Sequence, residues 1–220
     1  MGLEDYKEIV ANVASVCTMG HMLSGTLVCK DIYKKGSSEG FDAKPFVFGI
    51  GVGMLMFQYA FILNDPAMIK VNMFGLTTSI LYVTVFYLYA PNKGEMMKLI
   101  GKTLGLASIF LAYAKFESPD LIEFRYGLLT TALLLMLVGT PLMNLDQVIK
   151  TKSTEILPFP LIAMGTVVSF LWLLYGIIID NGFIVFQNIV GLLLYFIQLS
   201  LFAIYPSKPA EATSSHSKKE

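Results

Sequence analysis

Long apolar stretches, separated by short polar segments, dominate this chain of 220 residues. A helix that crosses a bilayer needs roughly 20 mostly apolar residues, and seven stretches come near that length. They lie near residues 9–29, 45–63, 71–90, 99–115, 126–146, 159–179 and 183–205. The fourth is the weakest because Lys102 lies inside it. The pattern therefore predicts an all-α membrane protein with seven transmembrane helices.

The segment around Asn72 recurs around Asn188, 116 residues later. Other pairs on the same offset are Tyr59 with Tyr175, Gly75 with Gly191, Lys34 with Lys150 and Glu39 with Glu155. A duplicated unit of three helices is the simplest interpretation, and the fourth helix then restores the orientation that three crossings invert. The prediction is two parallel three-helix repeats joined by a linker helix, a layout typical of transporters.

This layout divides the chain into four parts. We expect a first repeat over residues 1–90, the linker helix and its loops over 91–125, and a second repeat over 126–206. The remaining residues, 207–220, are rich in Ser, Lys, Pro and Ala and lack an apolar period. Such a composition predicts a disordered tail.

Charge predicts the orientation in the membrane. Lys and Arg number 16, equal to Asp and Glu, yet twelve of the 16 fall in segments 30–44, 91–102, 147–158 and 206–220. Cytoplasmic loops carry an excess of Lys and Arg, so we expect these four segments, the tail included, to be cytoplasmic and the N-terminus to face outward. The N-terminal residues lack a basic leader, so the first apolar stretch is expected to remain as a helix.

Asn72 and Asn188 are the leading candidates for substrate contact. Each lies near the outer end of its predicted helix, three residues before a glycine. An Asn side chain both donates and accepts hydrogen bonds, as hydroxyl groups do. A single Asn in a membrane helix often joins helices instead. Two at matching repeat positions favour a shared central site for a hydroxylated ligand.

Trp172 is the one tryptophan of the chain, and its repeat counterpart is Met56. A lone Trp near the end of a membrane helix is often an interfacial anchor. Trp172 lies instead in the interior half of its predicted helix, about one turn from Tyr175. There an indole offers a flat apolar wall for the C–H face of a sugar ring.

Proline positions indicate hinges. Pro45 and Pro158 or Pro160 lie at the cytoplasmic starts of the second and sixth predicted helices, where a proline also simply fits the first turn. Pro141 lies inside the fifth, where it removes a backbone hydrogen bond and permits a bend. Its repeat counterpart is Gly25. The recurrence in both halves favours hinges near a cytoplasmic gate.

Ionisable residues are missing from the interiors of the second, third, fifth, sixth and seventh predicted helices. A proton-coupled carrier needs such groups, and His21 in the first helix is the one candidate. The prediction is uncoupled movement of a neutral polar solute. Metal-ligand clusters, nucleotide-binding loops and nucleophile–base pairs are also absent from the sequence, so we expect neither an enzyme nor a cofactor, and no nucleic-acid partner.

With these features in place, the chain resembles the SWEET family of sugar facilitators, particularly its animal members, over nearly all of residues 5–206. The family is known for parallel repeats of this kind. The most specific matching segments are Gln147–Glu155, Leu157–Phe159, Trp172–Gly176 and Asn188–Gly191. The second helix reads Gln58-Tyr59-Ala60 where many members have Trp-Tyr-Gly.

The resemblance implies roles for particular residues. It implies a sugar pocket lined by Asn72, Asn188, Trp172 and Met56. It implies a hinge set of four prolines, matched here by Pro45, Pro141 and Pro158, with Gly25 in place of the first. It also implies an outer gate at Tyr59 and Asp180.

The leading prediction is thus a facilitative, bidirectional sugar uniporter that works by alternating access, with a monosaccharide such as glucose as cargo. Two alternatives share the seven-helix layout. A cargo receptor would need basic residues within the bundle, and an amino-acid exporter would need an acidic residue on a late helix, where Asp146 lies only at a helix end. The choice of sugar, the plasma or Golgi membrane, and assembly into a homo-oligomer are left open.

Overall fold

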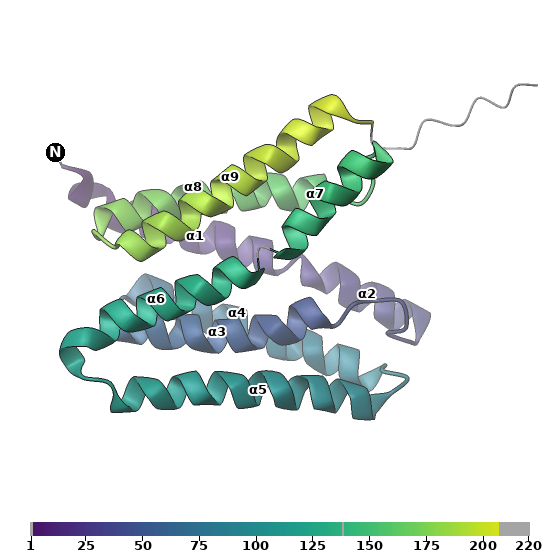
Figure 1. Cartoon of the computed structure of the whole chain (residues 1–220), viewed down its shortest axis with the longest axis horizontal. Coiled ribbons are helices and arrows are strands. Elements are labelled where there is room, and N and C mark those ends of the chain that lie inside the picture. Colours follow the sequence, from purple (N-terminus) through teal and green to yellow (C-terminus); the bar gives the residue numbers. More distant parts are fainter. Residues whose placement is uncertain (1, 138, 207–220) are drawn as a thin grey trace, which may run out of the picture.

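The computed structural model describes residues 2–137 and 139–206, without the side chains of Leu3 and of residues 137–144. The predicted tail, 207–220, lies outside the described residues. The elements are η1 (Leu3–Tyr6), α1 (Lys7–Met22), α2 (Gly25–Lys35), α3 (Lys44–Ile62), α4 (Pro66–Leu88), α5 (Lys93–Phe116), α6 (Pro119–Leu137), α7 (Gly139–Thr151), α8 (Phe159–Ile178) and α9 (Gly182–Ile204). The helices run along one another as a bundle (Figure 1).

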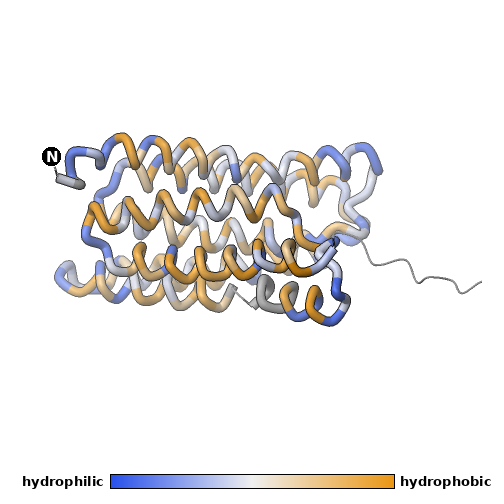
Figure 2. Tube along the Cα trace, turned by 90° about the horizontal axis from the view of Figure 1, so that it is seen from above, coloured by the Kyte–Doolittle hydropathy of each residue, from blue (hydrophilic) through white to orange (hydrophobic). Residues whose placement is uncertain are grey.

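The apolar content of these helices is that of a membrane protein. Among the described residues, five helices are long and apolar enough to cross a bilayer: α3, α4, α5, α8 and α9. Hydrophobic positions follow the length of the bundle, and hydrophilic ones gather at its two ends (Figure 2). The fourth predicted helix, the weakest in the sequence, is confirmed as α5 despite Lys102.

The first predicted span, 9–29, is two helices rather than one. The ladder of α1 ends at Met22, and Ser24 and Thr26 donate instead to carbonyls three residues earlier. Tyr82 of α4 occupies the break, where its hydroxyl donates to the Met22 carbonyl at 3.1 Å. A Cβ on Gly25 would lie 2.6 Å from the Tyr82 ring. Because Gly25 has no side chain, the Tyr82 ring can lie against the backbone at this point. The Tyr82 hydroxyl then takes the place of a hydrogen bond within the helix.

The fifth predicted span, 126–146, is also divided in the structure. It starts seven residues earlier than expected, at Pro119, and is described as α6 and α7, with residue 138 undescribed between them. Proline fits the first turn of a helix because its missing N–H has no partner there. The residues between 119 and 126 include several charged ones, so the apolar pattern in the sequence did not show that the helix begins at Pro119.

The two repeats pack with matching contacts. In the first repeat α1 packs against α4 and also crosses to α8, and in the second α6 packs against α9 and also crosses to α3. The linker α5 packs along α3. The first helix of each repeat therefore also packs against the other repeat. This packing forms the interface at which a shared site can lie.

Among the residues whose side chains are described, the buried core is continuous between the repeats at one end and divided at the other. One cluster there joins α1, α3, α4, α6, α8 and α9, around Tyr59, Tyr126 and Tyr175. At the other end the core is two separate clusters, one around Phe86 in the first repeat and one around Val148 in the second. We call these the closed end and the open end of the bundle. The repeats are thus held together at the closed end.

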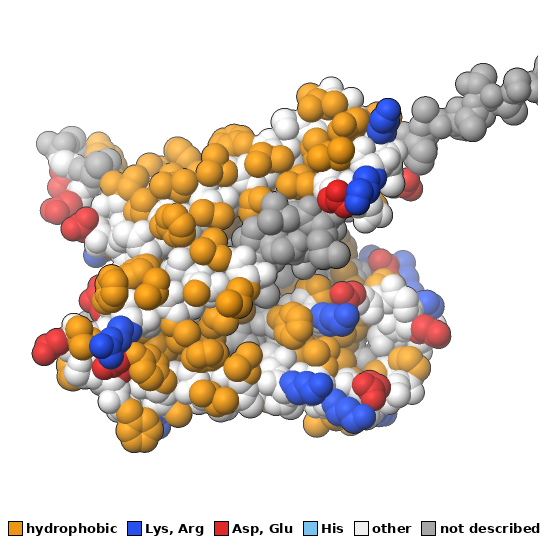
Figure 3. Space-filling model, viewed as in Figure 1, with side chains coloured by type: hydrophobic (Ala, Val, Ile, Leu, Met, Phe, Trp, Pro, Cys, Tyr) orange, Lys and Arg blue, Asp and Glu red, His pale blue; other side chains and the backbone are white. Residues whose placement is uncertain are grey.

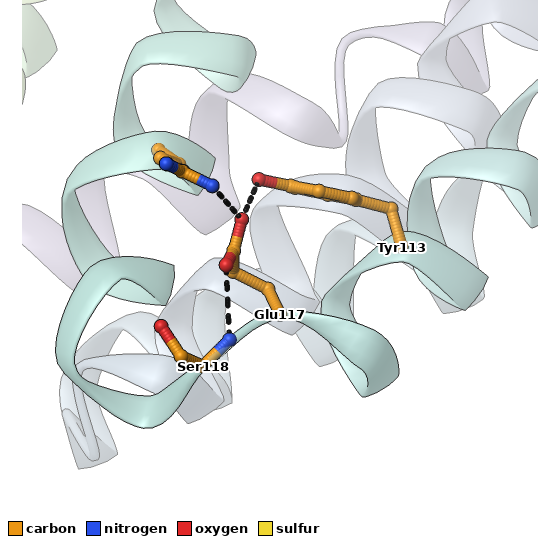
Figure 4. Close-up of polar contacts among 4 residues, drawn as sticks. Tyr113, Glu117 and Ser118 are labelled. Carbon is orange, nitrogen blue, oxygen red and sulfur yellow. Dashed lines mark hydrogen bonds and ion pairs between the residues drawn. The ribbon is translucent and has the colours of Figure 1, made fainter.

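An ion pair ties α5 to α6 at the closed end (Figure 4). Arg125 Nη1 donates to Glu117 Oε2 at 2.7 Å, the Tyr113 hydroxyl donates to the same oxygen, and the Ser118 N–H donates to Oε1 at 2.9 Å. Hydrogen bonds from Tyr113 and Arg125 lower the pKa of Glu117 from 4.5 to about 2. The carboxylate is therefore fully charged across the physiological range.

This pKa predicts a pH-dependent contribution to stability. Because the folded-state pKa is lowered, the contribution is present above pH 4.5 and is lost as the pH falls toward 2. We expect Glu117→Gln to lower the melting temperature of the detergent-solubilised protein at pH 7, with a gap to wild type that narrows between pH 4.5 and 2. A gap that stays constant over that interval would refute the assignment.

Candidate functional site

The paired asparagines occupy equivalent places in the two repeats. Asn72 on α4 donates from Nδ2 to the Met68 carbonyl at 2.9 Å, and Asn188 on α9 donates to the Ile184 carbonyl at 2.8 Å. Among the described residues, these are the only hydrogen bonds of either side chain. Each amide is therefore fixed by its own helix and keeps its carbonyl oxygen and one N–H for a ligand.

A cavity of about 320 Å³ lies between the repeats. Its described lining includes all four predicted pocket residues: Asn72, Asn188, Trp172 and Met56. The described side chains that line it are all uncharged. The structure thus brings together residues from α3, α4, α8 and α9 around a neutral space with a few polar groups, as ligand sites commonly are.

Trp172 is held in a fixed orientation by the first repeat. Its Nε1–H donates to Thr18 Oγ1 of α1 at 2.8 Å, and Thr18 in turn donates to the Ala14 carbonyl. The Tyr175 ring meets the indole edge-to-face, with centroids 5.4 Å apart. A rigid indole presents an apolar wall to the cavity without the entropic cost of fixing a mobile side chain on binding.

Two lining residues with polar side chains, Thr18 and Gln187, were missed in the sequence. Gln187 lies beside Asn188 on α9 and donates from Nε2 to Thr131 Oγ1 of α6 at 2.6 Å, leaving its carbonyl oxygen without a described partner. Both are polar residues inside long apolar stretches. That polarity was the available signal, but neither residue has a polar counterpart in the other repeat to draw attention to it.

Two hydrogen bonds close one end of the site, and they are related by the repeat. The Tyr175 hydroxyl donates to Asp65 Oδ2 at 2.5 Å, and Asn181 Nδ2 donates to the Tyr59 hydroxyl oxygen at 3.1 Å. Each tyrosine thus pairs with the residue that precedes the last helix of the opposite repeat. All four residues are buried. We call this reciprocal pair of bonds the tyrosine latch.

The latch residues also determine where the asparagines point. Asp65 Oδ1 accepts from the Met68 N–H at 2.9 Å and Asn181 Oδ1 from the Ile184 N–H at 3.0 Å, so each caps its helix. Asn72 and Asn188 each follow their cap by seven residues, or about two turns and ~10 Å of helix. Because each cap faces the opposite repeat, the asparagine two turns further along the same helix also faces the opposite repeat.

Of the two residues predicted at an outer gate, Tyr59 belongs to the tyrosine latch, and Asp180 lies next to its partner Asn181. Asp180 is exposed and has a φ of 53°, and Asn64, its repeat counterpart, has a φ of 50°. Both residues occupy the left-handed turn before a helix. The next residue, Asn181, then takes the position that faces Tyr59.

The site opens at the other end of the bundle. A second cavity of about 840 Å³ shares Met22, Met56 and Asn72 with the first and extends to Asp42 and Lys44 at the open end. Pro45 and Gly25 both line this second cavity. The space beside the paired asparagines is therefore reachable from the open end and blocked at the closed end by the latch.

The remaining predicted residues are Pro158, Pro141 and His21. Pro158 precedes the first residue of α8, and Pro141 lies in α7, where its side chain is outside the described residues. His21 is not among the described lining of either cavity, and its Nδ1 is buried without a hydrogen-bond partner among the described residues.

A duplicated helical bundle with a neutral cavity, open at one end and latched at the other, defines a membrane transporter. The family model described as "Sugar efflux transporter for intercellular exchange" matches twice, over residues 8–94 and 124–210. This chain belongs to that family, the SWEET sugar transporters, whose members are bidirectional facilitators and not enzymes.

Curated relatives support the assignment. Sugar transporter SWEET1 of Drosophila pseudoobscura pseudoobscura is 29% identical over 91% of this chain and 90% of its own length. Bidirectional sugar transporter SWEET10 of Arabidopsis thaliana is 33% identical over 79% of this chain and 62% of its own. Among solved structures, a eukaryotic SWEET transporter has the same fold, with a TM-score of 0.84, 24% identity, and coverage of 91% of this chain and 97% of that one.

The latch predicts an effect on access to the cavity. Tyr175→Phe removes the donor to a buried carboxylate, and hydrogen bonds to charged groups contribute about 1.5 kcal/mol or more, roughly tenfold in an equilibrium. We expect about tenfold faster labelling of Val71→Cys, in a variant with serines at Cys17 and Cys29, by an impermeant maleimide supplied from the closed end.

Tyr126→Phe is the matched control. Tyr126 lies in the same buried cluster, but its hydroxyl has no hydrogen-bond partner among the described residues. It is expected to leave the labelling rate unchanged. Equal rates in the two variants would show that the Tyr175 bond does not hold the closed end.

Proposed function

We propose that this protein is an uncoupled, bidirectional uniporter of a monosaccharide such as glucose, and that it works by alternating access. The observation that carries the proposal is the neutral cavity between the repeats, with Asn72 and Asn188 facing it from equivalent helices. The family supplies the broad class of cargo, a sugar. A monosaccharide as the particular cargo is supported by the number and kind of polar groups in the cavity.

The polar groups suit a ligand made of hydroxyls. Asn72 and Asn188 each offer one N–H and one carbonyl oxygen, and Gln187 offers a further acceptor. Trp172 supplies the apolar wall opposite them, with Met56 beside the cavity on α3. Neutral donors and acceptors bind a sugar weakly enough that it can leave on either side.

The charge distribution supports uncoupled movement. The described lining of the cavity holds no ionisable side chain, and a coupled carrier needs one to bind its ion where the substrate binds. Sugar flux should therefore follow the sugar gradient alone.

The latch and the open end support a rocking mechanism. In the opposite state the Tyr175–Asp65 and Tyr59–Asn181 bonds break while the repeats approach each other at the open end. Gly25, Pro45, Pro141 and Pro158 are the proposed hinges, since they lie where the helix ladders of both repeats begin or break. Tyr59 is a gate residue in this scheme, with Asn181 in the place expected for Asp180.

Orientation follows from the basic residues. Lys30, Lys34, Lys35 and Lys44 lie at the open end or on α2 leading to it. By the excess of Lys and Arg in cytoplasmic segments, the open end faces the cytoplasm and the N-terminus faces outward. We propose the plasma membrane as the site of action, with the Golgi membrane as the alternative.

Glucose equilibration into liposomes that contain purified protein tests the proposal. We expect wild-type protein to equilibrate radiolabelled glucose, and Asn72→Ala and Asn188→Ala each to slow the flux about fivefold, because a sugar hydroxyl loses its partner at about 1 kcal/mol. An imposed pH gradient should not drive accumulation.

Thr77→Val is the matched control, since Thr77 on α4 also donates to the carbonyl four residues earlier but faces away from the cavity. It is expected to keep wild-type flux. Absent flux in wild type, full flux in both asparagine variants, or uptake above equilibrium under a pH gradient would each overturn the proposal.

A further inference from the structure

The linker helix α5 and the first helix of the second repeat, α6, leave an apolar groove between them. Both helices pack on α3, which forms the floor of the groove. The groove has a volume of about 370 Å³ and lies between Leu106 and Phe110 on α5 and Leu133 and Met136 on α6. We call it the α5–α6 groove.

The groove is separate from the sugar cavity. The groove shares no described lining residue with the first cavity, since Met56 faces that cavity from one side of α3 while Leu55 faces the groove from the other. With the second cavity it shares Phe48 and Val52 of α3. The groove opens sideways, where Leu106 is 54% and Met136 75% exposed. In a membrane such side chains meet lipid, so the occupant comes from the bilayer and not from water.

The length of the groove matches one leaflet. Its lining on α5 runs from Leu99 to Phe110, which are eleven positions and ~16 Å of helix apart. The hydrocarbon core of a bilayer is about 30 Å thick. The groove therefore extends for about the depth that an acyl chain of one leaflet occupies.

Helix α6 diverges from α5 as it leaves their connecting loop (Figure 1). The Glu117–Arg125 ion pair holds the two helices together at the loop. The divergence widens the space between them toward the open end of the bundle. On this face of the molecule, apolar side chains cover the middle and Lys and Arg gather at the open end (Figure 3).

Lys102 is the one charged residue in the described lining of the groove. It lies nine residues, or ~13 Å, into α5, well inside the apolar stretch. Among the described residues it forms no ion pair, whereas Lys98 pairs with Glu95 at 2.9 Å and Lys150 with Asp146 at 2.6 Å. A charge at this depth is costly without a partner, and its four-carbon chain can extend toward the headgroups.

We propose that the α5–α6 groove binds an anionic phospholipid, with an acyl chain along the groove and the headgroup phosphate on the Lys102 ammonium. The leaflet is the one at the open end, which is the cytoplasmic leaflet on the orientation proposed above. Basic pockets between membrane helices on that side are suited to anionic headgroups. The lipid fills the space that the diverging helices leave and so joins the linker to the second repeat.

Native mass spectrometry of the full-length protein with added phosphatidylglycerol or phosphatidylcholine tests this proposal. We expect wild type to retain phosphatidylglycerol in preference to phosphatidylcholine, and Lys102→Gln to bind it about fivefold more weakly, the change that corresponds to ~1 kcal/mol for one Lys near a headgroup. Lys102→Arg should keep the affinity. Met136→Trp, which narrows the groove and keeps the charge, should weaken it.

Lys98→Gln is the matched control, because Lys98 lies on the same helix, outside the groove lining, and is already paired. It should bind phosphatidylglycerol as wild type does, and size-exclusion profiles should show that all variants are folded. Equal retention of the two lipids, unchanged binding in Lys102→Gln, or a lipid-free dimer with a second copy in the groove would overturn the proposal. None of these outcomes depends on sugar transport.

Discussion

The tyrosine latch is the interaction on which the rest of this structure depends. Tyr175 bonds Asp65, and Asn181 bonds Tyr59, so each repeat holds the start of the other's last helix. Because Asp65 and Asn181 also cap those helices, the latch fixes both the position and the rotation of α4 and α9. The asparagines two turns further on must then face each other's repeat. The latch and the lining of the cavity are consequently parts of one geometrical arrangement.

The bilayer explains why a few hydrogen bonds contribute so much to holding the two repeats together. Lipid tails are as apolar as the helices themselves, so association relies on close packing and on hydrogen bonds between helices more than on the hydrophobic effect. At the closed end, packing and the latch act together in one buried cluster around Tyr59, Tyr126 and Tyr175. At the open end each repeat has its own cluster. The bundle is therefore strongly joined on one side and free to separate on the other.

The features that could be predicted from the sequence are those that follow from its duplication and from the lengths of its apolar stretches. The seven helical passages, the paired asparagines, and the presence of Trp172 and Met56 in the lining of one cavity could all be anticipated, since each is local or repeats on a fixed offset. The break at Gly25 could not, because its cause is Tyr82 from another helix. The hydrogen bond between Asn181 and Tyr59 could not be anticipated either, because which residue takes the left-handed turn before α9 depends on backbone geometry. Thr18 and Gln187 were missed because a polar residue without a repeat counterpart carries no positional signal.

In the proposed rocking mechanism, closing one end of the bundle and opening the other are a single event governed by the latch. Spin labels on two exposed, repeat-related pairs can measure both ends by pulsed electron resonance: Asn64 with Asp180 at the closed end, and Glu39 with Glu155 at the open end. In the Tyr175→Phe background we expect a longer distance for the first pair and a shorter one for the second. Both distances lengthening together, or the first lengthening while the second stays unchanged, would contradict it.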